Sequence, residues 1–174
     1  MGHGNYLSDL VSMIGTLFLF CYWPSFNAAL GDGAAMQRAI INTYLSISCS
    51  VIAAIIVAKL THEGKLEMEI ILNASLAGGV AVGSSADIIT LPFGAMIAGF
   101  ITGAVSSFGF AYLSKFLQRT IKLHDSCGVL NLHGIPGVIG GIISAIVASR
   151  MDLDATFGDN YDDYKMVETR SAST

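Results

Sequence analysis

Residues 127–149 read CGVLNLHGIPGVIGGIISAIVAS, a run without a single Asp, Glu, Lys or Arg. A helix of about 20 mostly apolar residues is long enough to cross the hydrocarbon core of a bilayer. The run therefore predicts a membrane-spanning helix. It also carries a packing signal, because Gly137 and Gly141 are four residues apart and small residues at that spacing let a neighbouring helix come close.

Four further stretches have the same apolar character, and they cover about residues 10–30, 40–60, 70–86 and 92–117. The stretch 70–86 is shorter than the others and rich in small residues. Only 13% of the chain is charged, against about 25% in an ordinary soluble domain. The sequence therefore predicts an all-α membrane protein, with about five transmembrane helices in residues 1–150.

The basic residues between these stretches predict an orientation. One set of connections carries Lys59, Lys65, Lys115, Arg119 and Lys122, and the other set carries Arg38 and Arg150. Cytoplasmic loops are enriched in Lys and Arg. We therefore expect the N-terminus and the loops around His62 and Arg119 to be cytoplasmic, and the residues after Arg150 to lie outside.

Residues 151–174 differ sharply from the rest of the chain. They are polar and acidic and show no periodicity, which predicts a disordered acidic C-terminal tail. An odd number of spans followed by such a tail suggests that the chain lacks parts of a larger protein. The net charge of -4 gives no support for nucleic-acid binding. Because the three cysteines have neither Cys-x-x-Cys nor metal-ligand spacing, we expect them to be reduced and expect no metal or cofactor.

His133 is the candidate functional residue of the last span. An ionisable side chain at membrane depth is costly and indicates function by default. On a helix, Val129, His133, Gly137 and Gly140 would share one face, which would line a narrow apolar tube with a single polar station. The alternative is a packing histidine that hydrogen-bonds to a neighbouring helix.

The sequence YWPSFN at residues 22–27 contains a second candidate site. Pro24 is expected to interrupt the first span. Trp23 and Phe26 are large flat side chains, and Asn27 offers hydrogen bonds, so the segment could form a gate with a cation-friendly aromatic face. An aromatic belt at the membrane interface with a kink is the alternative, and composition slightly favours it.

Other polar and small residues have structural explanations. Gly79 with Gly83, and Gly99 with Gly103, have the spacing of helix–helix contacts. Asp125 precedes the last span and is expected to cap its first turn. An enzyme has little support, because one histidine without a nucleophile or a second ligand makes a poor catalytic set.

The chain resembles the Rhesus-type branch of the ammonium transporter/Rhesus glycoprotein family from about residue 9 to residue 149. The stretches that carry the resemblance are GTLFLFCYWPSFNAAL, RAIINTYLSIS, GKLEMEIILNASLAGGVAVGSSADI, PFGAMIAGFITGAVSSFGFAYLSKFL and HDSCGVLNLHGIPGVIGGI. The strings LAGGVAVG and NLHGIPG are its most specific parts. The resemblance implies a fold of eleven core helices in two inverted halves, assembled as a homotrimer with one pore per subunit.

This sequence matches the sixth to tenth of those helices. By motif, His133 would be the second of the paired pore histidines and Phe26 one of two stacked gate phenylalanines. Val129 would line the lumen near His133, and Trp23 and Asn27 would support the gate. The first pore histidine, the second gate phenylalanine and the eleventh helix have no counterpart in the chain.

The resemblance therefore implies transport of ammonia or ammonium by an integral protein of the plasma membrane. A non-conducting membrane subunit of the same ancestry is the alternative. In the transport reading, ammonium loses water and a proton at the gate, because a bare ion in apolar surroundings is costly. Neutral imidazoles can donate and accept hydrogen bonds along the tube.

Overall fold

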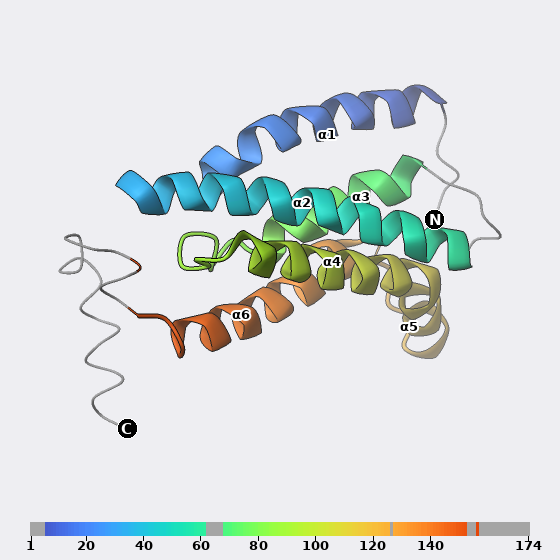
Figure 1. Ribbon diagram of the computed structural model, residues 1–174. Coiled ribbons are helices and arrows are strands. Elements are labelled where there is room, and N and C mark those ends of the chain that lie inside the picture. The colour runs from blue at the N-terminus through green and yellow to red at the C-terminus, as the bar shows by residue number, and fades with distance from the viewer. Residues whose placement is uncertain (1–5, 62–67, 126, 153–155, 157–174) are drawn as a thin grey trace.

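The computed structural model describes residues 6–61, 68–125, 127–152 and 156, apart from the side chains of residues 69 and 70. Every regular element in these residues is helical. The elements are α1 (Tyr6–Asn27), α2 (Gly33–Thr61), α3 (Met68–Ala81), α4 (Pro92–Phe108), η1 (Gly109–Leu113), α5 (Ser114–Thr120), η2 (Leu130–Gly134) and α6 (Ile135–Ala148) (Figure 1). The segments η1 and η2 are π-helical. The all-helical fold class is confirmed.

Four spans are long and apolar enough to cross a membrane. They are α1, α2, the continuous helix Pro92–Thr120 and the continuous helix Leu130–Ala148. The remaining one, α3, has 14 residues and is therefore about 21 Å long. It ends at Ala81 rather than near residue 86, because Gly83 and the two serines after it continue as turns. Gly and Ser are weak helix formers.

Small residues let α2, α3 and α4 approach one another closely. A Cβ atom on Gly99 would lie 2.7 Å from Ser46 Cα, and one on Gly103 would lie 2.7 Å from Ser50 Cα. Towards α3, Ser46 Oγ donates to the carbonyl of Gly78 at 2.7 Å and Ser50 Oγ to that of Ala74 at 2.6 Å. Close backbones with polar bonds between helices are typical of membrane proteins. The packing role predicted for Gly99 and Gly103 is confirmed.

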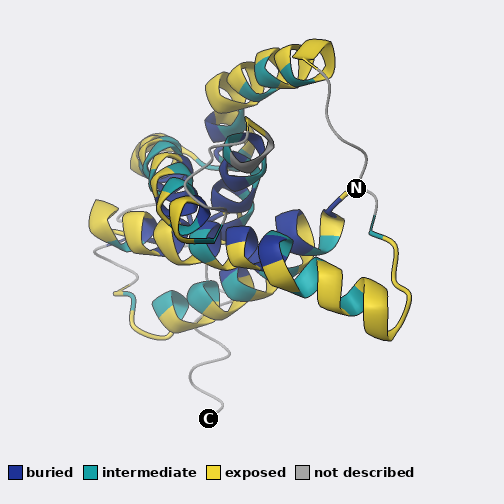
Figure 2. Ribbon diagram, turned by 90° about the vertical axis from the view of Figure 1, so that its right-hand side faces the viewer, coloured by how far each residue is buried: buried dark blue, intermediate teal, exposed yellow. Residues whose placement is uncertain are grey.

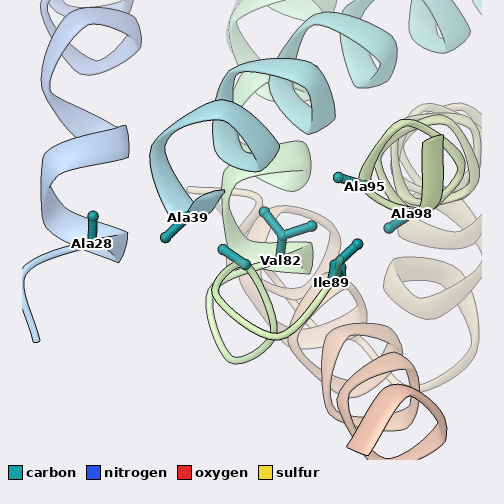
Figure 3. Packing of buried hydrophobic residues seen from close by; sticks show 7 residues of the cluster. Ala28, Ala39, Val82, Ile89, Ala95 and Ala98 are labelled. Atoms are coloured by element: carbon teal, nitrogen blue, oxygen red, sulfur yellow. The ribbon is translucent and has the colours of Figure 1, made fainter. Parts of the chain in front are cut away.

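The buried core is made mostly of alanine. Its members lie where α2, α4, the α3–α4 linker and the residue after α1 meet (Figure 3), and they are Ala28, Ala39, Val82, Ala86, Ile89, Ala95 and Ala98. Asn42 ties the linker to α2, because its Nδ2 donates to the carbonyls of Ala86 at 2.8 Å and Ile89 at 2.7 Å. The core therefore gains contact by close backbone approach rather than by large side chains.

Large apolar side chains lie instead on the outside of the molecule. Along α1, Leu7, Val11, Ile14 and Phe18 are each more than half exposed, and they follow one another three or four residues apart on one helical face. Exposed residues likewise cover the outer sides of the other helices (Figure 2). A surface of this kind suits hydrocarbon rather than water, which agrees with an integral membrane protein.

Arg38 fastens the α3–α4 linker to the beginning of the tail. Its Nε donates to the carbonyl of Asp87 and one terminal nitrogen to that of Thr156 at 2.7 Å. Thr156 is 5% exposed. The other residues of the tail after Asp152 lie outside the described part, so its predicted disorder stays a prediction. These bonds place the end of α6, the linker and the start of α2 at the same end of the bundle.

This shared end allows the predicted orientation to be tested on the described residues. In a variant whose native cysteines are replaced by alanine, we expect Thr120→Cys to react with an impermeant thiol reagent only from the cytoplasm. We expect Asp32→Cys to react only from outside, because it precedes α2 at the opposite end. Both residues are exposed. Reaction of the Thr120→Cys variant from outside would reverse the orientation; the loop around His62 lies outside the described residues.

Candidate functional site

Trp23 and Asn27 hold the last turn of α1 against α2 and α3. Asn27 Nδ2 donates to Thr43 Oγ1 at 3.2 Å and to the carbonyl of Gly79 at 3.3 Å. The indole of Trp23 lies over Gly79, where a Cβ atom would be 2.7 Å from Nε1. Only glycine therefore fits beneath the indole without displacing it. The contact explains why this position of α3 is small.

Phe26 belongs to the same turn but projects away from these contacts. Its side chain is 80% exposed. Pro24 is buried, and α1 continues through it to Asn27, so the predicted interruption of the helix at Pro24 is wrong. Proline removes one backbone hydrogen bond, and here the helix ends within one turn after it. The lost bond is therefore confined to the last turn of the helix.

Asp125 caps the helix that carries His133, as predicted. Its Oδ1 accepts from the backbone N–H of Val129 at 2.9 Å and its Oδ2 from that of Leu130 at 2.8 Å. Gly128, between Asp125 and the first helical residues, has a φ of 68°, a left-handed conformation that glycine adopts without strain. The cap and the glycine together fix where the helix starts.

Replacing Asp125 with alanine is expected to destabilise the chain by about 1 kcal/mol, the usual cost of losing a helix cap. Thermal unfolding in detergent measures the effect. Asp9→Ala is the matched control, because it removes one carboxylate from the first turn of α1. Equal melting temperatures for the two variants would contradict a capping role for Asp125.

His133 lies inside the π-helical segment η2, which the sequence did not predict. The N–H of Ile135 donates to the carbonyl of Leu130, five residues back. Pro136 follows directly and has no N–H with which to continue an α-helical pattern. That proline was the available signal in the sequence. Single π-helical turns are frequent at functional sites.

Val129, His133 and Gly137 are all exposed, and their spacing of four residues puts them near one side of the helix. Gly140 does not belong to that face. It is buried, and a Cβ atom there would lie 2.7 Å from the carbonyl oxygen of Ala81. Within the described residues no helix makes the predicted close approach at Gly137 and Gly141, since nothing lies within 4 Å of a Cβ atom at Gly141 and Gly137 makes ordinary contact with Val80. The packed side of α6 runs instead through Pro136, Gly140, Ile143 and Val147.

The helix α3 connects the two parts of the candidate site. Gly79 contacts Trp23, and the next two residues, Val80 and Ala81, contact Gly137 and Gly140 of α6. Three consecutive residues of α3 therefore set the distance between the end of α1 and the histidine-bearing helix. A shift of α3 would move both parts together.

The exposed side chains at the end of α1 and beside His133 are apolar, apart from the imidazole itself. Phe26 is 80% exposed and Val129 51% exposed. Within the described residues, His133 makes no hydrogen bond or ion pair. An unpaired imidazole on such a face can accept or donate a hydrogen bond to a small polar molecule. The hydrogen bond to a neighbouring helix, which a packing histidine would need, is not found in the described part of the chain.

Apolar outer faces, glycine-mediated packing and spans of membrane length define an integral membrane protein of several helices. The chain matches the family model of the Ammonium Transporter Family over residues 2–170, and it belongs to that family. It is of the Rhesus type, as the following similarities show.

The chain is 53% identical over 147 residues to ammonium transporter Rh type C of Xenopus laevis, and 50% identical over 151 residues to the Homo sapiens protein of that name. These matches cover 83% and 86% of the chain, but 31% and 32% of the relatives. The chain thus spans about a third of their length. A solved structure described as Nitrosomonas europaea Rh50 and the conduction mechanism of Rhesus channels superposes with a TM-score of 0.79 at 38% identity. That match covers 83% of this chain and 38% of the other.

Proposed function

We propose that this chain supplies part of the wall of an ammonia- or ammonium-conducting pore in the plasma membrane. The observation that carries the proposal is the position of His133. Its imidazole lies exposed and without a hydrogen bond in the described residues, on one face with Val129 and Gly137, in a chain of the ammonium transporter family.

The chemistry of that face suits ammonia better than ammonium. A bare cation is costly in apolar surroundings, so ammonium transfers its proton to bulk water at the entrance and ammonia passes the apolar stretch. Ammonia then exchanges hydrogen bonds with the imidazole of His133, whose ring nitrogens can donate and accept. Pore width and hydrogen bonding then set selectivity. Phe26, with its exposed ring at the end of α1, restricts entry to this path, and Trp23 and Asn27 hold that end in place.

The pore needs a second wall that the described residues do not provide. The face of His133 is exposed, and the chain spans about a third of the length of its relatives. We propose that helices equivalent to the first half of those relatives cover this face, and that the complete unit assembles as a homotrimer. The chain alone is then not expected to conduct.

A non-conducting subunit is the second candidate, because the described residues leave the face of His133 exposed and do not enclose a path. In that case the chain would occupy the membrane, or associate with a complete family member, without forming a path of its own. The two candidates differ in whether the His133 face works once the missing wall is present.

A chimera separates them. The matched 147-residue segment of the Xenopus laevis relative is replaced with that of this chain, and ammonia flux into proteoliposomes is measured by internal pH. We expect flux from the chimera comparable to that of the parent relative, and none from the present chain alone. A chimera that inserts in equal amount without flux would support the non-conducting subunit. Selective flux from the chain alone would overturn the incomplete pore.

A further inference from the structure

Asn131 is a buried polar residue two positions before His133. It is fully buried, with 0% of its surface exposed. Its Nδ2 donates to Ser114 Oγ at 2.6 Å, which joins η2 to the first residue of α5. Residues two apart on a helix point in nearly opposite directions. Asn131 therefore faces the packed interior while His133 faces outward.

The helix opposite Asn131 is shaped to receive it. A Cβ atom on Gly109 would overlap the Asn131 amide, at 3.0 Å from its Cγ. Gly109 is the first residue of the other π-helical segment, η1, and Ser114 directly follows that segment. The Asn131 amide therefore spans η1 from one end to the other. The two π-helical segments are connected through this single side chain.

The hydrogen bonding of Asn131 argues against a role in stability alone. Its Oδ1 is buried and has no partner in the described part of the chain. A buried carbonyl without a partner destabilises the folded chain, so a leucine of similar volume would stabilise this position as well or better. Because the Asn131 amide stabilises the fold so little, its presence is better explained by the way it orients η2.

We infer that Asn131 is a positioning residue for His133. By bonding to Ser114 across Gly109, it fixes the rotation of η2 and keeps the extra residue of the π-helical turn at Leu130–Gly134. Without this bond, η2 can return to α-helical hydrogen bonding, and His133 then rotates away from the face shared with Val129. The effect on transport rests on the proposed function, whereas the effect on the orientation of residue 133 does not.

The orientation is measurable in the chain itself by pulsed electron paramagnetic resonance. Nitroxide labels are placed at His133→Cys and at Ser48→Cys, an exposed position of α2, after the native cysteines have been replaced by alanine. The parent is expected to give one narrow distance distribution. Asn131→Leu is expected to shift it or to add a second peak, and Ser114→Ala to do the same more weakly.

Two controls separate positioning from general loosening. Ser144→Ala also removes a tertiary hydrogen bond, since Ser144 Oγ of α6 donates to the carbonyl of Ser84 in the α3–α4 linker at 2.9 Å, but far from η2, and it should leave the distribution unchanged. Ser114→Thr keeps the hydroxyl and should give the same distance distribution as the parent. An unchanged distribution in Asn131→Leu overturns the inference. If that variant does not fold, an unchanged distribution in Ser114→Ala overturns it equally.

Flux gives a second, separate readout. In the chimera, Asn131→Leu should lower ammonia flux severalfold with equal protein in the membrane, whereas Ser144→Ala should not. A shifted distance distribution together with no flux in any chimera would reject the proposed function and leave the positioning role standing. A shifted distribution with full flux would show that the orientation of His133 does not matter for conduction and would overturn its relevance to the site.

Discussion

Replacing Gly99 with leucine should push α4 away from α2 and destabilise the fold of the chain. A Cβ atom at this position would lie 2.7 Å from both the carbonyl carbon and the Cα of Ser46, and closer still to its carbonyl oxygen. These are backbone atoms of a helix, so they cannot rotate away as a side chain would. The two helices must move apart.

The expected loss is a substantial fraction of the total stability. Overpacking a well-packed interior costs about 1–3 kcal/mol, and occasionally more, while folded proteins are stable by only about 5–15 kcal/mol. Separation of α2 from α4 also affects α3, because Ser46 Oγ bonds to the carbonyl of Gly78. Gly99→Leu therefore breaks two helix contacts with one substitution.

Unfolding by denaturing detergent, followed by the fluorescence of Trp23, measures this effect. Trp23 is the only tryptophan of the chain, and it reports on the contact between α1 and α3. Gly15→Leu is the matched control, because no atom lies within 4 Å of a Cβ at Gly15 and the substitution removes a weak helix former. Equal unfolding midpoints for the two variants would show that the close approach of α2 and α4 does not stabilise the fold.

The main features of the fold could be predicted from the sequence because they depend on local properties. Apolar length gives the spans, and the spacing of Gly99 and Gly103 gives a packing face. The carboxylate of Asp125 just before an apolar run gives the helix cap. Each of these signals is contained in a few neighbouring residues, and the structure confirms them.

The errors arise where the outcome depends on which side of a helix is covered. On α6, Gly137 and Gly141 carry the same spacing signal as the glycines of α4, yet Gly140 makes the close contact with Ala81. The spacing of glycines identifies one face of a helix, but it does not say which helix packs against that face. The buried amide of Asn131 was missed for the same reason, since its burial depends on Ser114 and Gly109. For the π-helical turn at His133, Pro136 was the only local signal.

The two candidate regions differ in how far the sequence could describe them. Val129, His133 and Gly137 share an exposed face as expected, and Trp23 and Asn27 pack against α3. Their roles in a pore follow from the family resemblance, and they stay proposals because the described residues leave the face of His133 uncovered. The packing of α3 between both regions became visible only in three dimensions.

His133→Phe is expected to block conduction in the chimera while leaving its insertion unchanged. The phenyl ring fills the space in front of the exposed face and removes the imidazole that can exchange a hydrogen bond with ammonia. We expect flux to fall by about tenfold or more, which corresponds to about 1.4 kcal/mol or more on the barrier.

Ile146→Phe is the matched control, because Ile146 is 52% exposed on the same helix and lies about three and a half turns from His133. Since His133 makes no hydrogen bond in the described residues, its loss should cost little stability, and both variants should reach the membrane in equal amounts. Unchanged flux from His133→Phe would assign His133 to packing, whereas a loss of flux shared by Ile146→Phe would show that any added ring on this helix disturbs the pore.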